Sequence, residues 1–114
     1  MIEIDKLTKV GSDILNSEGM ILGLFSDKYK NLFLRSILKD GSGFVFYSSN
    51  TEILKKFFAS EITLNQVYIQ SEDDWITIHY RNRKTDLIKK TNLVGMIQCG
   101  EEKYCDIPKD MRCL

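Results

Sequence analysis

The stretch NLFLRSILKDGSGFVFYSSNTEILKKFFAS, residues 31–60, decides most of the fold. An apolar run at residues 32–39 precedes the turn Asp40-Gly41-Ser42-Gly43, and a second apolar run covers residues 44–47. Glycines in such a turn supply the positive φ angles of a tight connection between antiparallel strands. The stretch therefore predicts a β-hairpin.

A helix is expected directly after this hairpin. Ser49 and Glu52 have the spacing of a capping box, in which each side chain bonds the backbone of the other. Burial of the apolar stripe that follows contributes several kcal/mol, at about 1.5–3 kcal/mol per large side chain. The stripe consists of Ile53, Leu54, Phe57 and Phe58, with Lys55 and Lys56 facing away. We expect this helix to cover the sheet.

The flanking segments complete the predicted element order. Apolar residues at helical spacing predict a helix over residues 3–17, and the run at 20–25 predicts a strand. Residues 64–70 and 75–80 alternate in polarity and predict a second hairpin around the charged turn 71–74. Residues 81–90 are expected to form a loop or one or two turns of helix, residues 93–99 a sixth strand, and residues 106–114 an irregular tail.

The resulting order is α-β-β-β-α-β-β, with room for one more strand. Consecutive strands joined by short turns pair antiparallel. We therefore expect an α+β fold in one domain over residues 1–114. It has a single antiparallel sheet of five to six strands with two helices packed on it, or a small open barrel.

Charge and composition restrict the function classes. Sixteen basic residues balance sixteen acidic ones, and the pI is about 6.6. Nucleic-acid binding is usually supported by a net positive charge, so it is disfavoured, whereas self-association as a homodimer is allowed. The N-terminal residues lack a secretory pattern, and no apolar run is long enough to cross a bilayer. These features predict a cytoplasmic protein.

No set of residues in the sequence predicts catalysis or metal binding. His79 is the only histidine, and the three cysteines are Cys99, Cys105 and Cys113. Their spacing lacks the close pairs of structural zinc sites and matches no nucleophile motif. We expect reduced thiols, with a Cys99–Cys105 disulfide as the alternative. We expect no catalytic residue, metal or cofactor.

The predicted second hairpin carries large aromatic residues on otherwise polar faces. Tryptophan and tyrosine dominate the energetics of protein interfaces. The residues predicted to contact a partner are Tyr68, Trp75, Thr77 and His79. The main hypothesis is therefore a non-catalytic binding module that acts through a protein partner or through itself, as an adaptor, a chaperone-like protein or an immunity-type inhibitor. Alternatively, the first helix covers these residues.

A basic segment follows the same hairpin and gives a further hypothesis. Aromatic side chains beside positive charge hold single-stranded nucleic acid by stacking and phosphate contacts. The residues of this phosphate- or nucleic-acid-binding alternative are Tyr80, Arg81, Arg83 and Lys84. A solvated loop explains the same charges.

The run RSILKDGSGFVFYSSNTEILKKF, residues 35–57, resembles the flavin-binding split barrels of the pyridoxamine-phosphate-oxidase type. The resemblance implies binding of FMN, with Ser48, Ser49 and Lys55 at its phosphate. The chain departs from that family at Ile53 and Leu54, where basic side chains are expected, and it is short in the strands that complete the barrel. The element order also resembles type III secretion chaperones, which are cytosolic dimers that wrap an unfolded effector segment.

Overall fold

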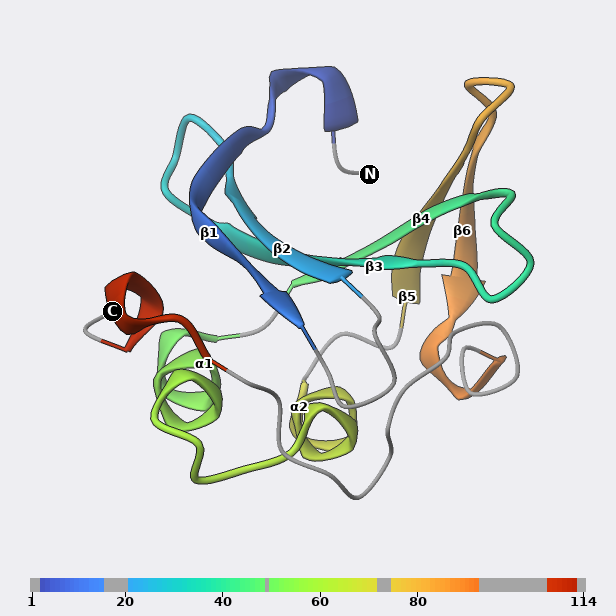
Figure 1. Ribbon diagram of the computed structural model, residues 1–114. Coiled ribbons are helices and arrows are strands. Elements are labelled where there is room, and N and C mark those ends of the chain that lie inside the picture. The colour runs from blue at the N-terminus through green and yellow to red at the C-terminus, as the bar shows by residue number, and fades with distance from the viewer. Residues whose placement is uncertain (1–2, 16–20, 49, 72–74, 93–106, 113–114) are drawn as a thin grey trace.

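The computed structural model describes residues 3–15, 21–48, 50–71, 75–92 and 107–112. Six strands and two α-helices make up the fold, with three single 3-10 turns (Figure 1). The strands are β1 (Thr8–Leu15), β2 (Ile21–Ser26), β3 (Leu32–Ile37), β4 (Gly43–Ser48), β5 (Trp75–Tyr80) and β6 (Thr85–Lys89). The helices are α1 (Thr51–Phe58) and α2 (Leu64–Gln70), and the 3-10 turns are η1 (Ile4–Lys6), η2 (Lys90–Asn92) and η3 (Lys109–Met111).

The strands form one antiparallel sheet in which sequence order is also spatial order. Strands β1 and β6 are the two edges, so the sheet is open rather than a barrel. Figure 1 shows α1 and α2 below one face of the sheet and the N-terminal turn η1 on the opposite side. The predicted α+β class, with a single six-stranded antiparallel sheet and two helices, is confirmed.

The predicted hairpin and the helix after it are confirmed. Strands β3 and β4 pair from Phe33 with Ser48 to Ile37 with Phe44, and Gly41 in their turn has a φ of 74°. Helix α1 begins after Asn50, whose side chain accepts a hydrogen bond from the Ile53 backbone N–H at 2.9 Å. Asn50, one residue later than predicted, is therefore the cap, and Ser49 lies outside the described residues.

The helix predicted over residues 3–17 is wrong, because most of this segment forms β1. A bulge lies between Val10 and Ile14: these residues are four apart, but their partners Leu24 and Leu22 are only two apart. The bulge places both apolar side chains toward the core. An apolar spacing of four in a bulged strand therefore imitates the spacing of a helix.

The strand predicted over residues 64–70 is also wrong, because these residues form α2. Thr63 accepts from the Gln66 N–H, and the Gln66 side chain accepts from the Thr63 N–H, so a complete capping box starts the helix. Strand β5 pairs instead with β4 and with β6. The predicted loop over residues 81–90 is a short turn followed by β6, and the strand predicted over 93–99 lies outside the described residues.

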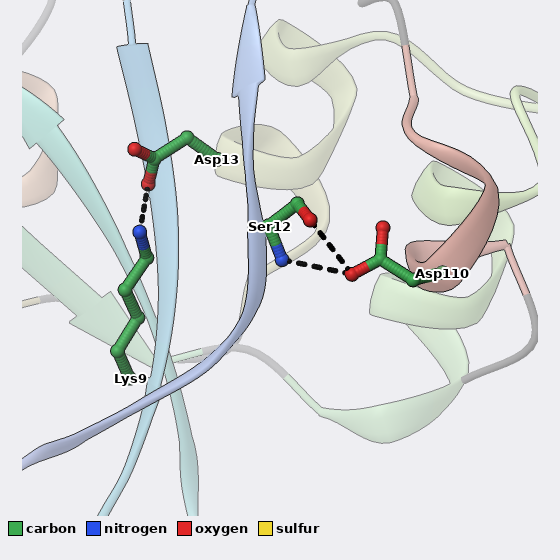
Figure 2. Close-up of polar contacts among 4 residues, drawn as sticks. All are labelled: Lys9, Ser12, Asp13 and Asp110. Atoms are coloured by element: carbon green, nitrogen blue, oxygen red, sulfur yellow. Dashed lines mark hydrogen bonds and ion pairs between the residues drawn. The ribbon is translucent and has the colours of Figure 1, made fainter.

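The C-terminal turn η3 packs against the bulge of β1. Asp110 of η3 accepts hydrogen bonds from the Ser12 backbone N–H at 3.0 Å and the Ser12 hydroxyl at 2.8 Å. Figure 2 shows Ser12 and Asp13 on opposite sides of β1, with Asp13 paired to Lys9 at 2.7 Å. Met111 is fully buried beside Gly11, whose φ of 67° the bulge requires.

The core lies between the sheet and the two helices. All four apolar residues of the α1 stripe are buried there, as the sequence predicts. The sheet contributes alternate side chains, which are mainly leucine, isoleucine and valine. Within the described residues, neither helix has the length and apolar character needed to cross a lipid bilayer.

Candidate functional site

The sheet face opposite α1 and α2, called the far face from here on, is also rich in apolar side chains. Side chains alternate along a strand, so residues between the core positions belong to the far face. Its central members are Phe25, Phe33, Arg35, Phe44, Phe46, Trp75, Thr77 and Leu87. An antiparallel sheet often leaves its second face polar and hydrated, so this composition indicates a second packing or binding surface.

A hollow of about 500 Å³ opens on the far face. The buried side chains of Phe33, Phe46 and Thr77 line it, and Glu3 and Lys6 border it from the N-terminal turn. Ligand sites typically occupy about 300–1,000 Å³ and combine an apolar lining with a few polar groups. The hollow has the size of a site for a small ligand or for one or two side chains of a partner, and its lining is about half polar.

Exposed apolar side chains gather around this hollow. The described residues include four exposed large hydrophobic side chains, and three of them line it: Tyr29, Trp75 and Leu87 are 73%, 53% and 44% exposed. The fourth, Ile69, is 68% exposed on α2. Contiguous exposed apolar groups mark interaction sites, whereas single ones are ordinary. The far face is thus the strongest candidate binding surface in the described part of the chain.

Two lysines stand against the aromatic groups at the rim. The Lys28 ammonium lies 5.0 Å from the centre of the Tyr29 ring, and the Lys89 ammonium lies 5.9 Å from the centre of the Trp75 ring. Neither lysine forms an ion pair within the described residues, whereas Lys6 pairs with Glu3 at 3.2 Å. The rim therefore offers cations next to exposed rings.

Arg35 lies on the far face between two phenylalanines. Its guanidinium carbon is 4.9 Å from the centre of the Phe25 ring and 4.8 Å from that of Phe44. A side chain at Gly23 would collide with Phe25 and crowd this guanidinium, so glycine makes room for it. Among the described residues, the buried Nε atom of Arg35 has no hydrogen-bond partner.

The turn that holds Tyr29 at the rim is organised by Asp27. Its carboxylate accepts hydrogen bonds from the Tyr29 and Asn31 backbone N–H groups, each at 2.9 Å, and from the Asn31 side chain at 3.0 Å. Partial desolvation would raise the pKa of Asp27, but these hydrogen bonds outweigh it and lower the pKa below its ordinary value. The ionised carboxylate is therefore engaged within its own turn.

The four residues predicted to contact a partner lie in three places. Trp75 is on the rim of the hollow and Thr77 in its lining. His79 lines a second hollow of about 610 Å³ with Arg83 and Thr85, and its Nδ1 is 3.0 Å from the Thr85 hydroxyl. The N-terminal turn borders both hollows.

Tyr68 is not on an exposed sheet face as predicted, because its segment is a helix. It is buried in the core between the sheet and α2, with its hydroxyl 3.1 Å from the Ser36 hydroxyl. Its ring centre lies 4.5 Å from that of Tyr47. Its position indicates a role in packing.

The basic segment forms the turn between β5 and β6. Arg81, Arg83 and Lys84 are exposed there, and Lys84 pairs with Asp86 at 3.6 Å. Tyr80 packs against the core on the helix side of the sheet. The structure thus gathers the three charges but separates them from an aromatic platform, which the nucleic-acid alternative requires.

The residues suggested for flavin phosphate do not line one hollow. Ser48 borders the far-face hollow, and its carbonyl accepts from the Ser71 hydroxyl at 2.9 Å. Lys55 is exposed on α1, which covers the opposite face of the sheet. Ser49 lies outside the described residues.

The described residues contain no cluster of three or more histidine, cysteine, aspartate or glutamate side chains that could hold a metal ion. Cys99, Cys105 and Cys113 lie outside the described ranges. The charged and polar groups of the far-face hollow include Glu3 paired with Lys6, the hydrogen-bonded Asp27, Lys28, a serine and a threonine. This set suits recognition of charge and shape better than proton transfer or nucleophilic attack.

The sequence pointed to Trp75 and Thr77 but missed most of the site. Leu87 lies in the segment predicted to be a loop, and no predicted site residue lies on the strand that carries Phe33 and Arg35. The available signal was the unbroken apolar run at residues 44–47, since apolar side chains on both faces of a strand predict that both faces are covered.

No protein-family model matches the chain, and neither curated proteins nor solved structures yield a match.

Proposed function

We propose that this chain is a non-catalytic binding module that recognises a protein segment on the far face. The single observation that carries the proposal is the gathering of Tyr29, Trp75 and Leu87 around one hollow. Exposed aromatic anchors beside a hollow with a buried aromatic floor are typical of the centre of a protein interface.

The buried residues in the lining of the hollow support a side chain of the partner as the main anchor. Phe33, Phe46 and Thr77 provide a buried lining, while Trp75 and Leu87 remain exposed to close over an inserted group. Interface residues of this kind cost about 2 kcal/mol or more when truncated to alanine. Truncation of Trp75 should therefore weaken binding about thirtyfold or more.

The test is selection from a random peptide library on the immobilised chain. Peptides enriched on the wild-type chain are then measured against Trp75→Ala and against Ile69→Ala. Both variants remove an exposed apolar side chain, but Ile69 lies on α2, on the other side of the sheet. The proposal predicts that Trp75→Ala loses binding and Ile69→Ala retains it.

Equal binding by both variants, or no enriched peptide at all, overturns the proposal. Sedimentation of the wild-type chain addresses self-association. A dimer that Trp75→Ala converts to a monomer would assign the far face to a second copy of the chain instead of to another protein.

A further inference from the structure

We infer that the partner segment is acidic: its carboxylates meet Arg35, Lys28 and Lys89, while an apolar side chain between them enters the hollow. This inference rests on the proposed function and adds the chemistry of the partner.

Arg35 supplies the first argument. Its guanidinium carbon lies over the Phe25 and Phe44 rings, 4.9 and 4.8 Å from their centres, so rings of two neighbouring strands hold it in place on the sheet. Its hydrogen bonds must then be made through its N–H edges, yet its buried Nε has no acceptor among the described residues. The buried Nε itself is closed to a partner, but the guanidinium forms no ion pair among the described residues, and a carboxylate that contacts its terminal N–H groups matches it in charge and shape.

The hollow adjoins this arginine. Arg35 on β3 is directly opposite Phe46 on β4, and Phe46 lines the hollow. A segment whose apolar side chain contacts Phe46 therefore passes next to the guanidinium. A partner segment with one apolar residue near one acidic residue would fill the hollow and pair with the Arg35 guanidinium.

The rim charges supply the second argument. The acids that border the hollow are already engaged, because Glu3 pairs with Lys6 and Asp27 accepts three hydrogen bonds from its own turn. Lys28 and Lys89 have aromatic contacts but no carboxylate within the described residues. Hydrogen bonds leave the negative charge of Asp27 in place, but the three cations Arg35, Lys28 and Lys89 outnumber it, so this surface is positive and complements an acidic partner.

Nucleic acid would meet the same cations with phosphates but fits the surface less well. Stacking needs free ring faces, and a lysine lies against one face of each of the exposed rings of Tyr29 and Trp75. The chain as a whole carries no net positive charge. A thymidine oligonucleotide is therefore included as a competitor in the test.

The experiment uses peptides selected on the full chain from the random library. Enriched peptides should combine aspartate or glutamate with an aromatic or leucine residue. Their affinity should fall about 10- to 100-fold in Arg35→Gln, as expected for a lost charge-assisted hydrogen bond. Arg35→Lys should retain part of the affinity. Lys56→Gln on α1, which removes an exposed cation on the other side of the sheet, should bind as the wild type does.

Folding of each variant is checked by urea denaturation. If Arg35→Gln does not fold, the combined Lys28→Gln and Lys89→Gln variant replaces it, because Lys28 lines the hollow and Lys89 lies against Trp75, which also lines it. This variant should weaken acidic peptides at least severalfold and reduce the salt dependence of binding.

The two proposals fail in different ways. Neutral or basic peptides that bind in a Trp75-dependent manner overturn the acidic partner and leave the binding face intact. The acidic partner is also overturned if acidic peptides bind the lysine variant and the folded Arg35 variants as tightly as they bind the wild type. It is overturned as well if a thymidine oligonucleotide binds more tightly and displaces the peptides. Loss of Trp75 dependence overturns the proposed function itself.

Discussion

Replacing Gly11 with alanine is expected to destabilise the fold by disrupting the contact between β1 and the C-terminal turn. Gly11 has a φ of 67°, a conformation that costs an L-residue roughly 1–2 kcal/mol. Alanine restricts the unfolded chain and recovers about 0.4–1 kcal/mol. The backbone effect alone is therefore a net loss of about 1 kcal/mol.

Steric overlap adds to this backbone effect. A Cβ atom at Gly11 would lie 2.2 Å from the sulfur of Met111, which is fully buried. Methionine is flexible, but moving it means withdrawing part of a side chain whose burial contributes about 1.5–3 kcal/mol. The expected total for Gly11→Ala is about 2–4 kcal/mol.

Gly41 provides the matched control. Its φ of 74° is close to that of Gly11, but a Cβ atom there would meet no atom within 4 Å. Gly41→Ala should therefore show the backbone effect alone, about 1 kcal/mol. In a Met111→Ala background, the additional cost of Gly11→Ala should fall toward that same value, since the overlap with Met111 is gone and only the 3.3 Å approach to the Asp110 carboxylate remains.

Urea denaturation followed by tryptophan fluorescence measures these differences, since Trp75 is the only tryptophan. Far-UV circular dichroism provides the second probe of two-state unfolding. Equal losses for Gly11→Ala and Gly41→Ala would refute the close packing of η3 on the β1 bulge. A full Gly11→Ala cost in the Met111→Ala background would refute Met111 as its cause.

Three further outcomes are expected. Tyr68→Phe should lower the free energy of unfolding by about 1–2 kcal/mol, because the buried Ser36 hydroxyl loses a partner at 3.1 Å; no loss in urea denaturation contradicts that bond. Thr63→Ala should cost about 1 kcal/mol through loss of the α2 cap, and an unchanged denaturation midpoint would argue against the capping box. The pKa of Asp27 is lowered in the folded state, so its ionised form stabilises the fold at any pH above its ordinary pKa of 3.8. This stabilisation is lost as the pH falls below 3.8 and the carboxylate becomes protonated. Asp27→Asn should therefore weaken the dependence of the unfolding free energy on pH in this acidic range. An unchanged pH dependence would show that the carboxylate is not stabilised in the folded state.

The part of the fold that was predicted depends on local signals. The Asp40-Gly41 turn and the apolar stripe of α1 each act within one element, so they could be read from neighbouring residues. In the two wrongly predicted elements, β1 and α2, the spacing of apolar residues imitates that of the other kind of element. In β1 the bulge at Gly11 changes the spacing of apolar residues, and only pairing with β2 shows that the segment is a strand.

Helix α2 carried a local signal that polarity alternation concealed. Val67 and Ile69 are two apart, as in a strand, but Ile69 is 68% exposed on the structure while Val67 is buried. The Thr63-to-Gln66 spacing is the usual start of a helix and favours the correct assignment. Short apolar segments are ambiguous by periodicity alone, and the cap resolves the choice here.

The candidate site was less predictable because it depends on register. Tyr29, Trp75 and Leu87 belong to three separate segments, and only the pairing of six strands brings them around one hollow. The sandwiched position of Arg35 likewise requires that β2 and β4 both pair with β3. Strand register is specified by tertiary packing, so these neighbours cannot be read from one strand.

Acrylamide quenching of Trp75 fluorescence, with and without a selected tryptophan-free peptide, tests the far face as the binding surface most directly. Trp75 is 53% exposed, so the free chain should be quenched readily. A bound peptide should shield the ring and lower the quenching constant severalfold. A peptide that binds by fluorescence anisotropy but leaves the quenching of Trp75 unchanged would contradict this account.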